Sequence, residues 1–135
     1  MADFRTVTDD FSVSPQLTSA DVTAAAAKGF TMIINNRPDG EAPDQPPGEA
    51  IADAARQAGL AYAYIPVVGQ PTTEQASAVQ SATQAARGRT LAFCRSGTRS
   101  ITAWAMGQAA AGLRSRAELI ELGRAAGYDL AGALP

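Results

Sequence analysis

Short apolar runs alternate with longer segments of helical periodicity along most of this chain. The apolar runs predict buried strands, and the longer segments, most of which begin at Ser, Thr or Pro and end before Gly, predict helices. We predict strands within residues 11–13, 30–35, 60–67 and 90–94, and helices over 18–28, 47–58, 72–86, 99–111 and 115–126. This alternation predicts a single α/β domain over residues 1–135, with a central, mostly parallel sheet flanked by helices.

Composition and charge exclude several classes of protein. The 135 residues carry a net charge of −2, which gives no basis for binding nucleic acid or a membrane surface. The single cysteine cannot form an internal disulfide, and the absence of histidine excludes the usual zinc sites and Ser-His-Asp or Cys-His catalysis. We therefore expect no metal and no cofactor. Because no apolar run is long enough to span a membrane and the N-terminus lacks a secretory signal, we predict a cytoplasmic protein.

The only cysteine lies where a predicted strand meets a predicted helix. Cys94 is followed by small polar and basic residues, which are Arg95, Ser96, Gly97, Thr98, Arg99 and Ser100. Backbone N–H groups that converge at such a turn before a helix bind anions, and arginines beside the sulfur favour the thiolate. The pattern predicts an anion cradle with a nucleophilic Cys94 at its base. The alternative is a small buried cysteine before an ordinary turn.

Two further loops follow predicted strands and would meet Cys94 at one edge of a parallel sheet. One is residues 67–72. The other is residues 36–48, with Arg37 as a candidate second anion contact and Asp39 as a candidate acid, although their sequence is also typical of a plain turn. Arg95 points either to solvent or toward the anion. The hydroxyls of Thr98 and Ser100 either cap the next helix or serve the site, Ser100 by a hydrogen bond to the Cys94 thiolate.

Three segments, FSVSPQLTSAD, INNRPDGE and CRSGTRS, occur in this order and resemble the phosphatase-like domain of the beta-lactamase-hydrolase-like family. The resemblance covers most of the chain. It implies a fold related to the protein tyrosine phosphatases, with Cys94 as nucleophile and Arg99 as the anion-binding arginine. It also implies that the loop of Ser96, Gly97 and Thr98 holds an anion through its N–H groups. Members of this family are described both as phosphatases and as sulfur transferases.

The sequence departs from the tyrosine phosphatase pattern in three places. Four residues rather than five separate Cys94 from Arg99, Phe93 stands where histidine is usual, and residues 67–72 contain no acid. A positioned acid contributes about 10²–10⁴-fold when it protonates a leaving oxygen, whereas a leaving sulfite or thiolate is stable as an anion. The short Cys-x4-Arg anion-binding loop also resembles the active-site loop of rhodaneses.

These departures favour a cysteine-dependent sulfurtransferase that moves sulfane sulfur from thiosulfate or a persulfide through a Cys94 persulfide. The alternative is a phosphatase of the protein tyrosine phosphatase-like superfamily that acts through a Cys94 phosphocysteine, with Asp39 as its acid. A third possibility is an anion-binding module without turnover. The expected partner is a small anionic substrate, namely thiosulfate, a persulfide or phosphate. The resemblance adds functional pairing with a persulfide-oxidising enzyme, because some family members are fused to one.

Overall fold

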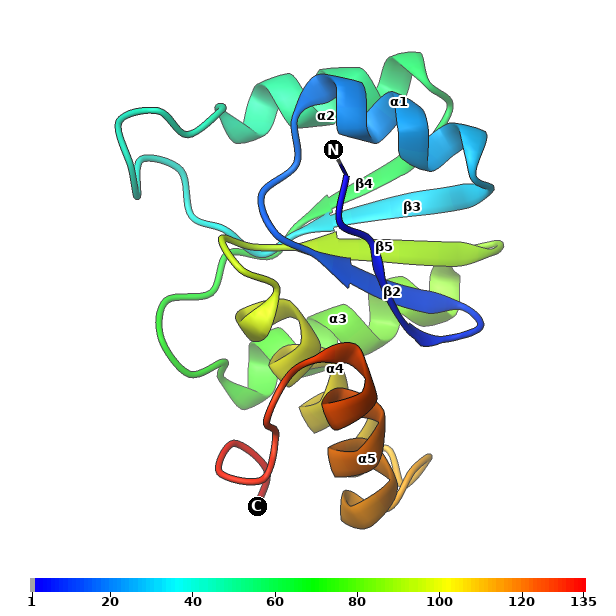
Figure 1. Cartoon of the computed structure of the whole chain (residues 1–135), viewed down its shortest axis with the longest axis vertical. Coiled ribbons are helices and arrows are strands. Elements are labelled where there is room, and N and C mark those ends of the chain that lie inside the picture. Colours follow the sequence, from blue (N-terminus) through cyan, green and yellow to red (C-terminus); the bar gives the residue numbers. More distant parts are fainter. Residues whose placement is uncertain (1) are drawn as a thin grey trace.

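The computed structural model describes residues 2–135, and every predicted strand and helix is present within a few residues of its expected bounds (Figure 1). The strands are β1 (Arg5–Thr8), β2 (Phe11–Ser14), β3 (Phe30–Asn35), β4 (Ala61–Tyr64) and β5 (Arg89–Phe93). The helices are α1 (Ser19–Ala27), α2 (Gly48–Gln57), α3 (Thr73–Ala85), α4 (Thr98–Ala110) and α5 (Arg116–Ala126). Side-chain caps fix three helix starts, because Thr18, Thr72 and Ser115 each accept the N–H three residues on.

The five strands form one mixed sheet in the order β1-β2-β5-β3-β4. The pairs β2–β5, β5–β3 and β3–β4 are parallel, which confirms the predicted mostly parallel sheet. Strand β1, which the sequence pattern did not predict, pairs antiparallel with β2 and forms one edge of the sheet. Its four residues contain a single buried apolar side chain, Val7, and so carry no clear strand signal.

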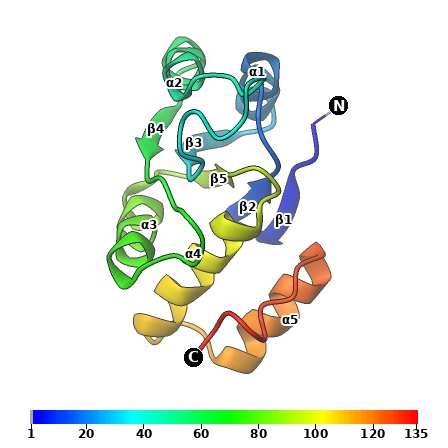
Figure 2. The same ribbon diagram turned by 90° about the vertical axis from the view of Figure 1, so that its left-hand side faces the viewer.

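Helices cover both faces of the sheet. Helices α1 and α2 lie on one face, whereas α3 and α4 lie on the other, and α5 lies beside α4 and packs against β1 (Figures 1 and 2). Along β5, Leu91 and Phe93 belong to the core under α1 and α2, while Ala92 belongs to the core under α4. This alternation is the two-residue period of a strand that is buried on both faces.

The four parallel strands end at one level. Phe93 at the end of β5 lies beside Ser14 of β2 and Asn35 of β3, and Asn35 in turn lies beside Tyr64 of β4. The loops that follow β3, β4 and β5 therefore emerge together, and Figure 2 shows them facing the viewer. This edge is where ligands bind in parallel α/β sheets.

Candidate active site

Cys94 follows directly after β5 and is buried, with 1% of its surface exposed. Its Sγ accepts a hydrogen bond from the backbone N–H of Gly97 at 3.1 Å. Gly97 precedes the first residue of α4 and has a φ of +95°, a left-handed conformation that glycine adopts without strain. The chain thus turns back over the sulfur, and the first-turn N–H groups of α4 lack helical acceptors beside it.

Tyr128, from the C-terminal segment, supports this turn. Its hydroxyl donates to the carbonyl of Ser96 at 2.8 Å. A side chain at position 97 would collide with the same hydroxyl. Gly97 is therefore required twice, once for its backbone conformation and once for the close approach of Tyr128.

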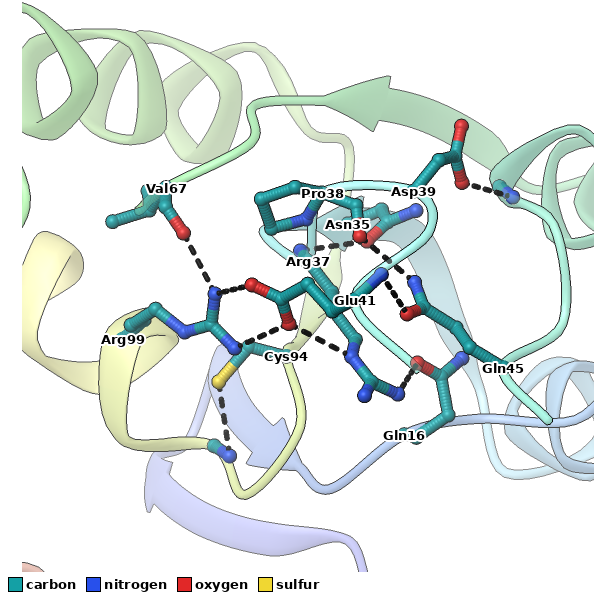
Figure 3. Close-up of polar contacts among 12 residues, drawn as sticks. Gln16, Asn35, Arg37, Pro38, Asp39, Glu41, Gln45, Val67, Cys94 and Arg99 are labelled. Carbon is teal, nitrogen blue, oxygen red and sulfur yellow. Dashed lines mark hydrogen bonds and ion pairs between the residues drawn. The ribbon is translucent and has the colours of Figure 1, made fainter. Parts of the chain in front are cut away.

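Arg99 extends over the loop, and its guanidinium binds a carboxylate with two N–H groups (Figure 3). Nη1 lies 2.7 Å from Oε2 of Glu41, and Nη2 lies 2.9 Å from Oε1 of the same group. Nη1 also donates to the carbonyl of Val67 at 2.7 Å. The Arg99 side chain is 18% exposed, so its fork is fixed in place but open to solvent on one side.

Arg37 contacts the same carboxylate from the opposite side. Its Nε donates to Oε1 of Glu41 at 3.0 Å, and its Nη1 donates to Oε1 of Gln16, also at 3.0 Å (Figure 3). The structure therefore brings together Cys94, Arg99 and Arg37, as the sequence predicted for an anion site, and adds Glu41 between the two arginines.

Glu41 and the two arginines stabilise one another's charged forms. The hydrogen bonds from Arg99, and then those from Arg37, lower the pKa of Glu41 from 4.5 to about 2, so this carboxylate is ionised at neutral pH. The Glu41 carboxylate in turn raises the pKa of Arg99, with a smaller contribution from Cys94. Two arginines that converge on one bound carboxylate form a site that accepts an oxyanion.

The structure does not bring Asp39, the candidate acid, to Cys94. Its Oδ1 accepts the N–H of Gly48 at 2.7 Å and so caps the start of α2, and its own N–H donates to the hydroxyl of Tyr64 at 3.1 Å. Figure 3 shows its carboxylate turned away from Cys94. The start of α2 holds this carboxylate, because the N–H groups in the first turn of a helix lack acceptors within the helix.

The other predicted loop residues divide between the surface and the interior. Arg95 is exposed, and its side chain forms no ion pair in the described part of the chain. The hydroxyls of Ser96 and Thr98 lie 3.0 Å apart and bond to each other, and Ser96 also accepts the N–H of Thr98. Ser100 is buried, and its hydroxyl has no hydrogen-bond partner among residues 2–135, so it neither bonds to Cys94 nor caps the helix.

Sequence reasoning missed several residues that build the site. Glu41 ends the INNRPDGE segment and stands four residues after Arg37, a spacing that pairs side chains in a helix but carries little weight in a loop. Gln16, Tyr64 and Tyr128 each form a hydrogen bond to a partner 21 to 32 positions away in the sequence. No local sequence pattern indicates such long-range contacts. Tyr64 is 44% exposed, and its hydroxyl accepts the N–H of Asp39, so it holds the loop after β3.

Residues 2–135 contain no group of three His, Cys, Asp or Glu side chains arranged as metal ligands. Within the same residues, every helix is too short or too polar to cross a membrane.

Comparison with known proteins agrees with this geometry. Residues 3–111 match the family model described as the phosphatase-like domain of beta-lactamase hydrolase-like protein. A beta-lactamase hydrolase-like protein from Xylella fastidiosa (strain Temecula1) is 39% identical over 125 residues, which cover 92% of this chain and 29% of that protein. The chain thus spans less than a third of this relative's length.

Solved structures show the same architecture. A candidate phosphatase from Neisseria meningitidis matches with a TM-score of 0.83 and 32% identity, over 95% of this chain and 91% of that one. Kinase associated phosphatase matches with a TM-score of 0.72 over 99% of this chain and 86% of that one, but at 15% identity, which shows the fold alone. The implied fold is confirmed, because the sheet and helices are those of a protein tyrosine phosphatase-like domain.

Proposed function

Since the chain belongs to the phosphatase-like domain family of beta-lactamase hydrolase-like proteins, we propose that it is a cysteine-dependent phosphatase that hydrolyses phosphate monoesters. This ranking reverses the one drawn from the loop sequence, which placed sulfur transfer first. The family and the phosphatase-like neighbours support the phosphatase reading better than sulfur transfer. Kinase associated phosphatase, whose fold this chain shares, has a catalytic cysteine.

One observation carries the proposal, namely the carboxylate bound beside Cys94. Arg99 holds both oxygens of Glu41 with parallel N–H groups at 2.7 and 2.9 Å. A phosphoryl group presents pairs of oxygens at a similar spacing and carries more charge, and guanidinium forks bind both kinds of group. The site is thus already arranged around an oxyanion next to a buried sulfur.

The reaction follows from these positions. The Cys94 thiolate attacks phosphorus, the bond to the leaving oxygen breaks, and a phosphocysteine forms. Arg99 and the N–H groups that begin α4 bind the non-bridging oxygens, whose charge they stabilise in the transition state. Water then attacks phosphorus, the P–S bond breaks, and inorganic phosphate and the thiolate are released.

Replacement of the nucleophile tests the proposal. We expect wild-type protein to hydrolyse an aryl phosphate and Cys94→Ser to lose turnover, because no histidine is present to activate a hydroxyl. The same variant should still bind inorganic phosphate, as measured by calorimetry, since the arginines remain. Turnover by Cys94→Ser close to that of the wild type would contradict a cysteine mechanism.

A cysteine sulfurtransferase remains the second candidate, because one feature of the structure favours it. Residues 67–72 contain no acid, and the carbonyl of Val67 instead accepts a hydrogen bond from Arg99. Sulfane sulfur transfer through a Cys94 persulfide needs no acid at that place. Parallel assays with thiosulfate and an aryl phosphate separate the two functions, and a thiol-removable sulfur on the Cys94 peptide in mass spectrometry would favour transfer.

The setting of the reaction is also part of the proposal. A small anionic substrate fits the two arginines under either function. Functional pairing with a persulfide-oxidising enzyme is a proposal that rests on the resemblance to the family. A cytoplasmic location is a proposal that rests on the sequence. This chain corresponds to 29% of the Xylella protein, so the activity of that longer protein is not assigned to it.

A further inference from the structure

The proposed phosphatase reaction needs a proton for the leaving oxygen, and the expected sources do not supply it. Residues 67–72 carry no acid, and Asp39 is bound to the start of α2. Glu41 is the only carboxylate in the described part of the chain that is hydrogen-bonded or ion-paired to residues 94–100. It comes from the loop after β3, and Figure 3 shows it beside Cys94.

We propose that Glu41 is the general acid of this site, and that substrate converts it to that role by displacing its carboxylate from Arg99. This inference rests on the proposed phosphatase function. In the unliganded protein the Glu41 carboxylate occupies the arginine fork that the substrate needs. The phosphoryl oxygens take over that fork, and the freed carboxyl group then lies next to the bound ester.

The loop around Glu41 allows its side chain to move while the backbone stays in place. The N–H of Glu41 donates to Oε1 of Gln45 at 3.0 Å, and Nε2 of Gln45 donates to the carbonyl of Pro38 at 2.9 Å. These bonds hold the backbone on both sides of Glu41. Its carboxylate, by contrast, is bound only by Arg37 and Arg99 in the described structure, and its side chain is 27% exposed. Rotation about side-chain bonds is therefore enough to release it.

Displacement also changes the protonation of Glu41 in the required direction. The hydrogen bonds from Arg99 are the main cause of its low pKa, followed by those from Arg37. When phosphoryl oxygens receive the bonds from Arg99, the main cause of the low pKa of Glu41 is removed. The negative charge of the bound ester then raises the pKa further, because like charges favour the neutral carboxyl. A carboxylate that is ionised at rest thus gains a proton from solvent when substrate binds.

The proton balance of the reaction is complete with this residue. In the first step the Cys94 thiolate forms the P–S bond, the P–O bond breaks, and the Glu41 proton moves to the leaving oxygen to give the free alcohol. In the second step water attacks phosphorus and gives a proton to the Glu41 carboxylate as the P–S bond breaks. The thiolate and the protonated Glu41 are then restored.

Leaving-group dependence tests the assignment. We expect Glu41→Gln to lower kcat/KM for phenyl phosphate by about 10²–10⁴-fold, because its leaving oxygen is basic and needs a proton. The loss with 2,4-dinitrophenyl phosphate should be less than about tenfold, because that leaving group is stable as an anion. Asp44→Asn is the matched control, since Asp44 lies on the same loop, is exposed and forms no ion pair in the described structure.

The outcomes separate this inference from the proposed function. If the wild type hydrolyses neither ester, both are overturned. If the wild type is active and Glu41→Gln loses the two activities equally, or shows only a lower KM with unchanged kcat, then Glu41 is not the acid and the phosphatase function stands.

A binding measurement gives a readout that does not depend on turnover. Sulfate is a dianion without a proton of its own near neutral pH, so we expect its binding to Cys94→Ser at about pH 5 to 6 to take up protons. Calorimetry in buffers of different ionisation enthalpy measures this uptake, which should disappear in Cys94→Ser/Glu41→Gln. Equal uptake in both proteins would contradict the displacement of Glu41.

Discussion

Arg99 defines the site through the shape of its side chain as well as its charge. Its guanidinium meets two oxygens of one carboxylate and also the carbonyl of Val67. A lysine ammonium at the same position would keep the charge but would not present two parallel donors. The geometry of the bound anion is therefore set by one planar group.

We expect Arg99→Lys to reduce kcat/KM for an aryl phosphate by roughly 10- to 150-fold, which corresponds to a lost charge-assisted hydrogen bond of about 1.5–3 kcal/mol. KM should rise and kcat should fall together, because the fork binds the substrate and the transition state. Arg87→Lys, an exposed residue at the other end of β5, serves as the control. Wild-type kinetics in Arg99→Lys would show that bulk charge is sufficient.

At the scale of elements, the loop between β5 and α4 depends on the C-terminal segment. Gly97 adopts a φ of +95°, and the Tyr128 hydroxyl both fills the space beside it and binds the carbonyl of Ser96 at 2.8 Å. The turn over Cys94 is therefore held from outside the strand and helix that it joins. Burial also raises the pKa of Tyr128, so its hydroxyl stays protonated and able to donate at neutral pH.

We expect Gly97→Ala to lower the free energy of unfolding by at least about 1–2 kcal/mol, the cost of a left-handed conformation for a residue with a Cβ. Tyr128→Phe should cost about 0.5–1.5 kcal/mol, the net value of one hydrogen bond. Because the added methyl group meets the Tyr128 hydroxyl, the double variant should lose less than the sum of the two. Urea denaturation measures all three, and strict additivity would contradict direct contact.

At the scale of the molecule, the Glu41 cluster joins segments that are far apart in the sequence. Glu41 and Arg99 are 58 positions apart, and Arg37 reaches Gln16 across 21. Their contacts tie the loop after β3 to α4 and to the segment after β2. Both arginine side chains are mostly buried, and both form ion pairs with Glu41 in the folded protein. Ionisation of Glu41 therefore stabilises the folded state.

The stability of the molecule should therefore depend on pH through Glu41. Its pKa is about 2 in the folded state and 4.5 ordinarily, so its contribution is present above about pH 4.5 and is lost as the pH falls toward 2. We expect the difference in Tm between wild type and Glu41→Gln to be largest above pH 5.5 and to shrink on acidification. The pH dependence that comes from the other carboxylates is the same in both proteins and cancels in this difference. A difference that does not change with pH would contradict the ion pairs.

The sequence by itself determined the elements and the place of the nucleophile. Apolar runs and helix caps are local signals, which is why the helices and β2 to β5 appear close to their predicted bounds. Strand–helix alternation further predicted a parallel sheet, and in such a sheet the residue after a strand must lie at the carboxyl edge. The sequence alone therefore predicts that Cys94, Arg37 and Arg99 lie at one site.

Only the tertiary structure decided which groups those residues meet. Asp39 and Glu41 are two positions apart in one loop, yet Asp39 caps α2 while Glu41 lies between two arginines. The direction of a loop side chain depends on contacts with distant segments, and no periodicity records it. Tyr128 supports the turn over Cys94 for the same reason, since only the packing of the folded chain brings the C-terminal segment to Ser96.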